Sequence, residues 1–173
     1  MSRIALVTNT AFLATVLALW ALFASAEPLP EPGGPVLLTV DGAISNTNAG
    51  KTAVFDLEML RSLGETEIVT ETIWTPGMHR FTGVSLEAFL TAVGAQGALL
   101  DAVAINDYSV EIPLSDATED GPIIAYEMDG KLMSRRDKGP LWMIYPYSSD
   151  PAYRTELIYS RSIWQLDRMT VME

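Results

Sequence analysis

The chain has 173 residues, and its 22 acidic against 11 basic side chains give a formal net charge of −11 at pH 7. Such an excess of negative charge repels phosphate backbones, so nucleic acid is excluded as the expected partner. The sequence has no cysteine and one histidine, so it has no disulfide and lacks the Cys and His set of a closed zinc site.

The first 26 residues have the pattern of a secretory signal peptide. Arg3 is their only charged residue, and an apolar run from Ala11 to Ala24 leads into the small residues Ser25 and Ala26. A charged start, an apolar centre and small residues at the end are the three parts of such a signal. The alternative, a retained anchor, needs about 20 strongly apolar residues, which this alanine-rich run does not supply. We therefore expect cleavage after Ala26 and a periplasmic or secreted protein that is not inserted in the membrane.

Residues 27–35 are rich in proline and glycine and predict a stiff linker, which leaves residues 36–173 as one domain. The predicted elements, in chain order, are a strand over Val36–Val40, a short helix that Thr52–Asp56 leads into, a strand over Glu67–Ile73, a loop over Trp74–His79, a helix that starts after Ser85, strands over Ala102–Ile105 and Ser109–Leu114, a short turn or helix over Ser115–Ala117, strands over Ile123–Met128 and Leu141–Ile144, a loop over Pro146–Ala152 and an extended segment over Ile163–Val171.

Four residues mark the ends of the two predicted helices. Asp56 and Ser85 are the expected N-caps, and Gly64 and Gly94 are the expected C-terminal stops. Many short strands with few helices, and no alternation of strand and helix, indicate the α+β class with a mixed sheet. The sequence therefore predicts a single α+β domain with a mixed β-sheet and a few short helices.

Four segments carry a family pattern in their order and spacing. They are Phe81–Leu86, which contains Thr-Gly-Val, Ile124–Leu132, which contains Ala-Tyr and Asp-Gly, Gly139–Pro146, and Ser160–Trp164. Together they resemble the oxidoreductase molybdopterin-binding domain of the sulfite oxidase type. The resemblance covers most of residues 80–168 and implies the fold of that domain.

One departure from the family concerns the metal. The family carries a metal-ligating cysteine in a loop upstream of the Thr-Gly-Val segment, and here that region, residues 69–77, holds no soft ligand. The chain is most similar to a small, cysteine-free periplasmic branch of the fold, some members of which resemble pterin-binding regulators of membrane-bound cyclic-di-GMP enzymes. The resemblance implies a pterin or molybdopterin-like ligand, no metal, and the periplasmic domain of a membrane signalling protein as partner.

Three candidate ligand-binding residues lie in or beside the loop over Trp74–His79. Trp74 offers an indole face for stacking, and Arg80 offers a planar fork of donors. His79 is a candidate pH-sensitive hydrogen-bonding partner. The alternatives are that Trp74 packs on the helix after Ser85, that Arg80 is a solvated charge, and that His79 is structural.

Four further candidates lie downstream. The turn that holds Asp107 and Tyr108 is placed by the family near the pocket mouth, where Asp107 could pair with the amino-pyrimidine edge of a pterin. Arg161 suits a carboxylate, a phosphate or a pterin carbonyl, and Trp164 is a second stacking wall. The alternatives are ordinary turn chemistry for Asp107, a salt bridge from Arg161 to Glu156 or Asp167, and a core position for Trp164.

Three functions follow from these features. The leading one is a non-catalytic, regulatory pterin-binding protein with a pocket between residues 74–80 and 161–164. The second is a molybdopterin-dependent oxidoreductase domain without the usual cysteine ligand, and the third is a ligand-free scaffold for protein interaction. No residue is assigned a catalytic role, because the sequence has no Gly-x-Ser-x-Gly elbow and no phosphate-binding glycine loop.

Overall fold

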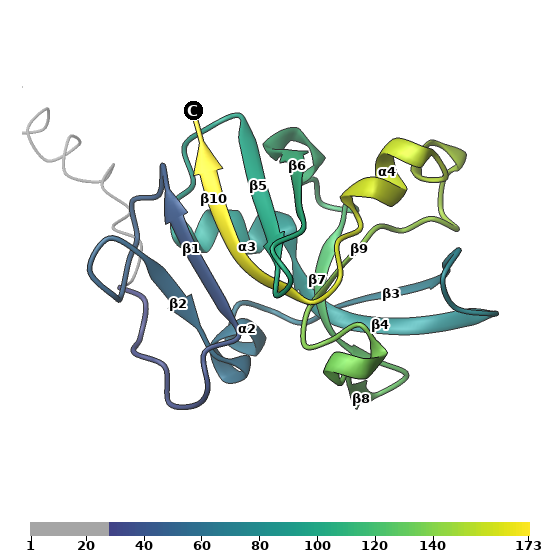
Figure 1. Ribbon diagram of the computed structural model, residues 1–173, viewed down its shortest axis with the longest axis horizontal. Coiled ribbons are helices and arrows are strands. Elements are labelled where there is room, and N and C mark those ends of the chain that lie inside the picture. Colours follow the sequence, from purple (N-terminus) through teal and green to yellow (C-terminus); the bar gives the residue numbers. More distant parts are fainter. Residues whose placement is uncertain (1–27) are drawn as a thin grey trace, which may run out of the picture.

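Two β-sheets organise the chain in a computed structural model that describes residues 28–173 (Figure 1). The predicted signal peptide, residues 1–26, lies outside this range. The strands are β1 (Leu38–Gly42), β2 (Ala53–Phe55), β3 (Thr66–Glu71), β4 (Met78–Ser85), β5 (Leu99–Ala104), β6 (Ser109–Pro113), β7 (Ile123–Met128), β8 (Lys131–Leu132), β9 (Trp142–Ile144) and β10 (Leu166–Met172). The helices are α2 (Leu57–Ser62), α3 (Leu86–Val93) and α4 (Glu156–Arg161), with 3-10 turns η2 (Leu114–Asp116), η3 (Arg135–Asp137) and η4 (Pro151–Tyr153).

The first sheet has the strand order β2-β1-β10-β5-β6, and it is mixed. Strand β1 runs parallel to β10, with Thr39 opposite Arg168, whereas the other strand pairs of this sheet are antiparallel. The second sheet has the order β3-β4-β7-β8, and β9 pairs with β7 as well. A mixed sheet with few short helices confirms the predicted α+β class, and the separate antiparallel sheet is a feature that the sequence did not predict.

Gly83 allows two strands of the second sheet to approach closely. A Cβ atom at this position would lie 2.2 Å from the carbonyl oxygen of Ile124, so any larger residue would force β4 and β7 apart. The pairing of these strands also shifts register between Thr82 and Gly83. The glycine of the Thr-Gly-Val segment is therefore explained by backbone packing.

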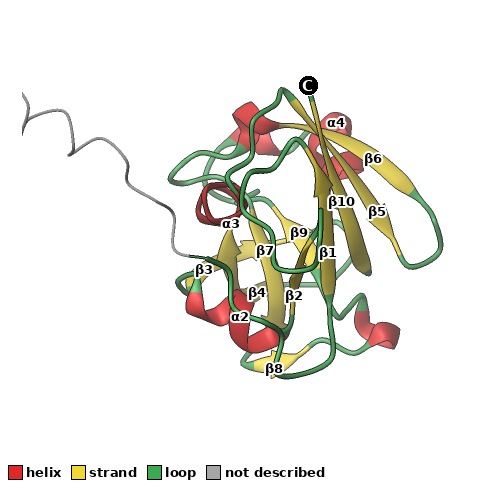
Figure 2. Ribbon diagram, turned by 90° about the vertical axis from the view of Figure 1, so that its left-hand side faces the viewer, coloured by secondary structure: helices red, strands yellow, loops and turns green. Residues whose placement is uncertain are grey.

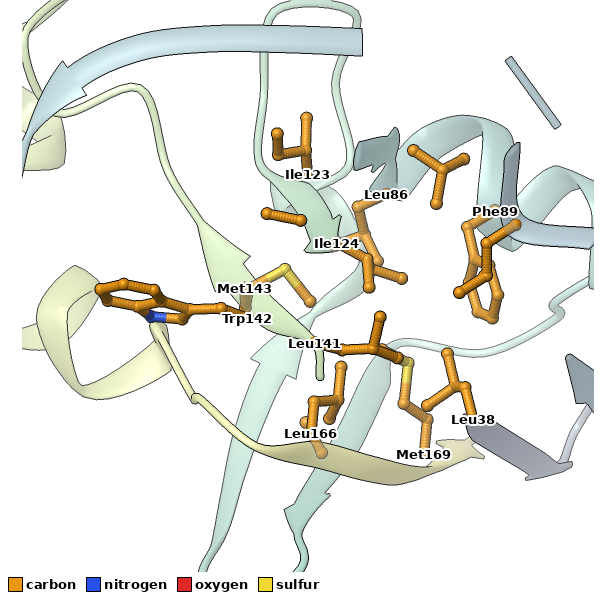
Figure 3. Close-up of a cluster of buried hydrophobic side chains, with 14 of the residues drawn as sticks. Leu38, Leu86, Phe89, Ile123, Ile124, Leu141, Trp142, Met143, Leu166 and Met169 are labelled. Carbon is orange, nitrogen blue, oxygen red and sulfur yellow. The ribbon is translucent and has the colours of Figure 1, made fainter. Parts of the chain in front are cut away.

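One continuous core joins both sheets and helix α3. Leu38 and Met169 come from the first sheet, Ile124 and Met143 from the second, and Phe89 from α3, and all are almost fully buried. Figure 3 shows these side chains gathered together, whereas the neighbouring Trp142 side chain points away from them. Alternate residues of a strand face opposite sides, so β9 contributes Met143 to the aliphatic core and leaves Trp142 for a second, aromatic cluster.

The two predicted helices are confirmed together with both N-caps and with Gly94 as the end of α3, whereas the C-cap of α2 is Leu63, one residue before the expected Gly64. The Asp56 carboxylate accepts a hydrogen bond from the backbone N–H of Met59, and the Ser85 hydroxyl accepts one from Ala88. Gly94 ends α3 in the left-handed conformation with φ of 60°. Within residues 28–173, no helix combines the length and apolar character needed to cross a membrane.

Three elements differ from the sequence-based expectation. Residues 53–55, which were expected only to lead into a helix, form strand β2, paired with β1, immediately before α2. Residues 78–85 form the long strand β4, of which Met78 and His79 were expected to be loop and the rest was assigned to no strand. Helix α4 was not predicted at all, although Thr155 caps it by accepting from the N–H of Ile158. In the two strands, pairing with distant partners outweighs the local preference.

Asp56 also fastens the N-terminal segment to the domain. Its second carboxylate oxygen accepts hydrogen bonds of 2.7 Å from the backbone N–H groups of both Gly33 and Gly34. The hydrogen bond from Met59 is the largest effect on the pKa of Asp56, and it lowers this pKa below the usual 3.8. The bonds from the two glycines add to the lowering, whereas burial acts in the opposite direction.

We expect Asp56→Asn to lower the free energy of unfolding by about 1 kcal/mol at pH 7, because a neutral amide accepts weaker hydrogen bonds than a carboxylate. The lowered folded-state pKa means that the carboxylate contributes fully above pH 3.8 and loses its contribution as the pH falls below that value. Urea unfolding of both proteins at neutral and acidic pH should therefore show a difference that shrinks in acid. Asp120→Asn, on the exposed turn before β7, is the control and should show no such trend.

A candidate aromatic pocket

A cavity of about 420 Å³ lies where several chain segments end beside helix α4. In Figure 1, α4 lies at the same end of the molecule as the β3–β4 hairpin. The lining residues come from the β3–β4 loop, the β5–β6 turn, α4 and the segment that joins α4 to β10, and they are Trp74, Ala104, Asn106, Tyr108, Tyr159, Ser160, Ser162, Ile163 and Trp164. Three of the seven predicted binding residues, Trp74, Tyr108 and Trp164, thus lie around one cavity.

Trp74 is the centre of an aromatic cluster. Its ring centroid lies 5.6 Å from that of Trp164, 5.7 Å from Trp142 and 5.8 Å from Tyr159, each in an edge-to-face arrangement. Such contacts favour a fixed ring orientation. Trp74 therefore packs on other aromatic residues, and it also lines the cavity.

Trp164 forms a partly exposed wall. Its residue is 38% exposed, so it is not a core tryptophan. Its backbone forms an isolated bridge with Trp142, and the ammonium of Lys138 lies 4.4 Å from its ring centroid. A cation at this distance is attracted by the ring. These contacts hold the indole at the cavity while leaving part of its surface accessible.

The polar side chains that line the cavity are neutral, and the Lys138 ammonium near the Trp164 ring is not part of the lining. Ser162 is buried, and its hydroxyl accepts from Tyr147 and donates to the carbonyl of Ile158. The side-chain oxygen of Asn106 accepts a hydrogen bond from the backbone N–H of Tyr108. Among the described residues, the Asn106 amide nitrogen has no hydrogen-bond partner. Among the described residues, no charged side chain lines this cavity. The site therefore offers aromatic surface and neutral hydrogen-bonding groups.

Burial of the tyrosines beside the cavity keeps them protonated. Burial, the largest effect, raises the pKa of Tyr147 to about 12, although its hydrogen bond to Ser162 acts in the opposite direction. The pKa of Tyr145 is also raised, first by burial and then by the nearby Asp116 carboxylate. Neither hydroxyl is therefore poised to exchange a proton near neutral pH.

Arg161 does not line the cavity, because a carboxylate on the opposite side holds it. Its Nη1 atom lies 2.9 Å from the Oδ2 atom of Asp116, which also accepts a 2.8 Å hydrogen bond from the hydroxyl of Tyr145. The Arg161 and Asp116 side chains are only 15% and 16% exposed. The partner is thus neither Glu156 nor Asp167. The Nε atom of Arg161 is buried without a hydrogen-bond partner among the described residues.

His79 and Arg80 lie on strand β4 away from the cavity lining. The His79 ring places Nδ1 2.7 Å from a carboxylate oxygen of Asp129 and Nε2 3.0 Å from the carbonyl oxygen of Pro76. Both partners accept, so both bonds form only when the ring carries two protons. The backbone N–H of Arg80, followed by His79, lowers the pKa of Asp129, and the Arg80 side chain pairs with Glu67. His79 thus links β4 to the turn between β7 and β8, and the Arg80 side chain links β4 to β3.

The β5–β6 turn places Tyr108 at the cavity and turns Asp107 away from it. Asp107 has a positive φ of 64° and an 84% exposed side chain, and it pairs with Arg168 at 2.6 Å. Asp107 thus has the ordinary turn role that the sequence analysis gave as the alternative to ligand binding. Within residues 28–173, no group of three His, Cys, Asp or Glu side chains is arranged to hold a metal ion.

Six lining residues were absent from the sequence-based candidates, namely Ala104, Asn106, Tyr159, Ser160, Ser162 and Ile163. Tyr159 and Ser160 lie on α4, which was not predicted, and Asn106 was considered only as part of a turn. The available signal was Thr155 followed by Glu156, a common start of a helix. The same helix would have placed Tyr159 and Ser160 immediately before the segment that carries Trp164.

The comparisons with known proteins bear on the same part of the chain. The model of the family described as "Oxidoreductase molybdopterin binding domain" matches residues 58–149, more than half of the 173 residues. No curated protein gives a significant match. The matched range runs from α2 to beyond β9 and contains Trp74, Asn106 and Tyr108. It agrees with the family that the motifs resembled.

Proposed function

The chain belongs to the oxidoreductase molybdopterin-binding domain family, and from this premise we propose that it binds an uncharged pterin in the aromatic pocket. The observation that carries the proposal is the gathering of Trp74, Tyr159 and Trp164 around one cavity of about 420 Å³. A pterin is flat and aromatic, and pockets of a few hundred Å³ with few polar groups are typical of small heterocyclic ligands.

The donor set fits the pterin ring better than the whole molybdopterin cofactor. The chain has no cysteine, so it supplies no thiolate ligand for molybdenum. Anionic phosphate groups are usually bound by arginine, lysine or helix N-termini, and the cavity lining has no cation among the described residues. Arg161, Arg80 and Arg168 are each paired with a carboxylate. These features support an unphosphorylated pterin without metal.

We extend the proposal to a non-catalytic, regulatory role. Burial keeps Tyr145 and Tyr147 protonated, and the lining contains no histidine or carboxylate that could act as acid or base. A protein that binds a small molecule without transforming it acts through a partner. The expected signal peptide supports a periplasmic location, and the resemblance to pterin-binding regulators supports a membrane signalling protein as that partner.

Trp164→Ala tests the pocket. We expect the affinity for a pterin to fall at least about fivefold, since losing one aromatic wall costs on the order of 1 kcal/mol. The melting temperature should change little, because Trp164 is 38% exposed. Calorimetric titration with neopterin, with thermal melts of the same samples, measures both quantities.

Trp164→Phe, which keeps an aromatic face, should retain most of the affinity. Ile73→Ala serves as a control, because Ile73 is exposed next to Trp74 and does not line the cavity. Neopterin triphosphate should bind more weakly than neopterin. Wild-type protein that binds neither compound, or a Trp164→Ala variant with unchanged affinity, would contradict the pocket assignment and favour the scaffold function.

A further inference from the structure

A second cavity, larger than the aromatic pocket, lies near α2 and β8. It measures about 770 Å³ and is bounded by the N-terminal segment, residues 30–37, by α2 and by residues 132–133. In Figure 2, α2 and β8 lie at the bottom of the molecule and α4 lies at the top. The N-terminal segment also precedes the residues that the family model matches. We refer to this cavity as the N-terminal groove.

The wall formed by the N-terminal segment is held in place by hydrogen bonds. The buried Asp56 carboxylate accepts from the N–H groups of Gly33 and Gly34, and the amide nitrogen of Asn48 donates to the carbonyl of Pro30. The backbone N–H of Leu37 donates to the carbonyl of Phe55. Several anchors along eight residues make this segment part of the folded domain, and the groove is therefore preformed.

The lining is mainly apolar. It includes Leu57 and Met59 of α2, Leu132 and Met133 of the β8 region, and Pro140. Leu132 is 57% exposed, which is unusual for a large aliphatic side chain beside a concave surface. Exposed apolar surface in a concavity with a polar rim is typical of an interaction site.

All ionisable side chains that line the groove, apart from Tyr126, are acidic. They are Glu31, Asp56 and Glu58, and no lysine, arginine or histidine lines it within the described residues. Glu31 is exposed and forms no recorded ion pair in that part of the chain. Glu58 pairs with Arg61 at 3.0 Å, but its side chain is 78% exposed, and such surface pairs contribute little. The electrostatic complement of this lining is a cation.

We propose that the N-terminal groove binds a basic, apolar segment of a partner protein. Large aliphatic side chains of that segment would occupy the space between α2 and Leu132, and a lysine or arginine would lie against Glu31 and Glu58. The net charge of −11 adds long-range attraction for a basic segment. The inference is independent of the pterin pocket, because the two cavities share no lining residue.

The proposal is tested with two labelled peptides, one that alternates leucine and lysine and one that alternates leucine and glutamate. Fluorescence polarisation with the purified mature protein should show binding of the first peptide only. Affinity should fall as salt rises from about 0.1 M to about 1 M, since the screening length shortens from about 10 Å to about 3 Å.

Two groove variants and two matched controls locate the binding. Leu132→Asp and the double variant Glu31→Lys/Glu58→Lys should each weaken binding by about tenfold or more, and their exposed positions preserve the fold. Leu157→Asp, at a 58% exposed leucine on α4, and the double variant Glu111→Lys/Glu119→Lys, at two exposed glutamates outside the groove lining, should bind the peptide like the wild type.

Several results would overturn the proposal. Equal binding of both peptides, or equal loss in the groove variants and the controls, would show attraction by general charge or apolar surface. Sedimentation showing a dimer that Leu132→Asp dissociates would identify a second copy as the occupant. Preserved neopterin binding in the groove variants would show that the fold is intact, so failure of this proposal and failure of the pterin site are separable.

Discussion

Trp142→Ala is expected to lower the free energy of unfolding by about 3–5 kcal/mol, the range measured when a large buried aromatic residue is truncated. Trp142 is fully buried, and its ring centroid lies 5.5 Å from that of Phe81 and 5.7 Å from that of Trp74. Its indole N–H also donates to the carbonyl oxygen of Ser162. Truncation would leave a void at the point where β9, the β3–β4 loop and the segment after α4 meet.

Urea unfolding measures the effect, and the matched comparison is Trp164→Ala in the same aromatic cluster. Because Trp164 is partly exposed, its truncation should cost far less stability while weakening pterin binding. Trp142→Ala should weaken binding as well, through displacement of Trp74. Equal stability losses in the two variants would show that the cluster is uniformly packed and that Trp164 is not a distinct ligand wall.

Asp116→Ala is expected to cost a similar amount, about 3–5 kcal/mol, because it leaves the charge of Arg161 largely buried without a partner. The Asp116 carboxylate accepts from both the guanidinium of Arg161 and the hydroxyl of Tyr145. It therefore connects η2, α4 and the residue after β9. Since α4 carries Tyr159 and Ser160 of the pocket, pterin affinity should fall together with stability.

The double variant Asp116→Ala/Arg161→Met should recover part of the lost stability, because replacing both members of a buried pair removes the unpaired charge. Glu67→Ala is the matched control for an exposed pair, that with Arg80, and should cost about 0–1 kcal/mol. If thermal and urea unfolding show that Asp116→Ala loses no more stability than Glu67→Ala, the Arg161–Asp116 pair does not hold α4 in place.

Local signals in the sequence were sufficient for helix α3 and for two walls of the pocket. Ser85 and Gly94 act through hydrogen bonds within a few residues, so their roles can be predicted from neighbouring sequence. Trp74 and Trp164 were predicted from their places in family motifs. Their ring contact joins residues 90 positions apart in the sequence, so neighbouring sequence could not predict it.

The partners of the charged candidates could not be predicted in the same way. Arg161 pairs with Asp116, 45 residues earlier, and Asp107 pairs with Arg168, 61 residues later. Sequence neighbours such as Glu156 were the natural candidates, but α4 turns Arg161 toward η2 instead. Charged side chains are long and find partners through tertiary structure, so Trp74, Tyr108 and Trp164 could be predicted from sequence, whereas Tyr159 and the ion pairs could not.

The position of β10 has a consequence for the order in which the protein can fold. This last strand of the described chain lies in the middle of its sheet, between β1 and β5. Before β10 is synthesised, β1 can pair only with β2, and β5 only with β6. The edges of β1 and β5 that later pair with β10 are then unpaired. Pairing between strands so distant in the sequence is slow to form. We expect this sheet to be completed late in folding, and a chain that is still unfolded can be exported through a narrow channel, as the proposed periplasmic location requires.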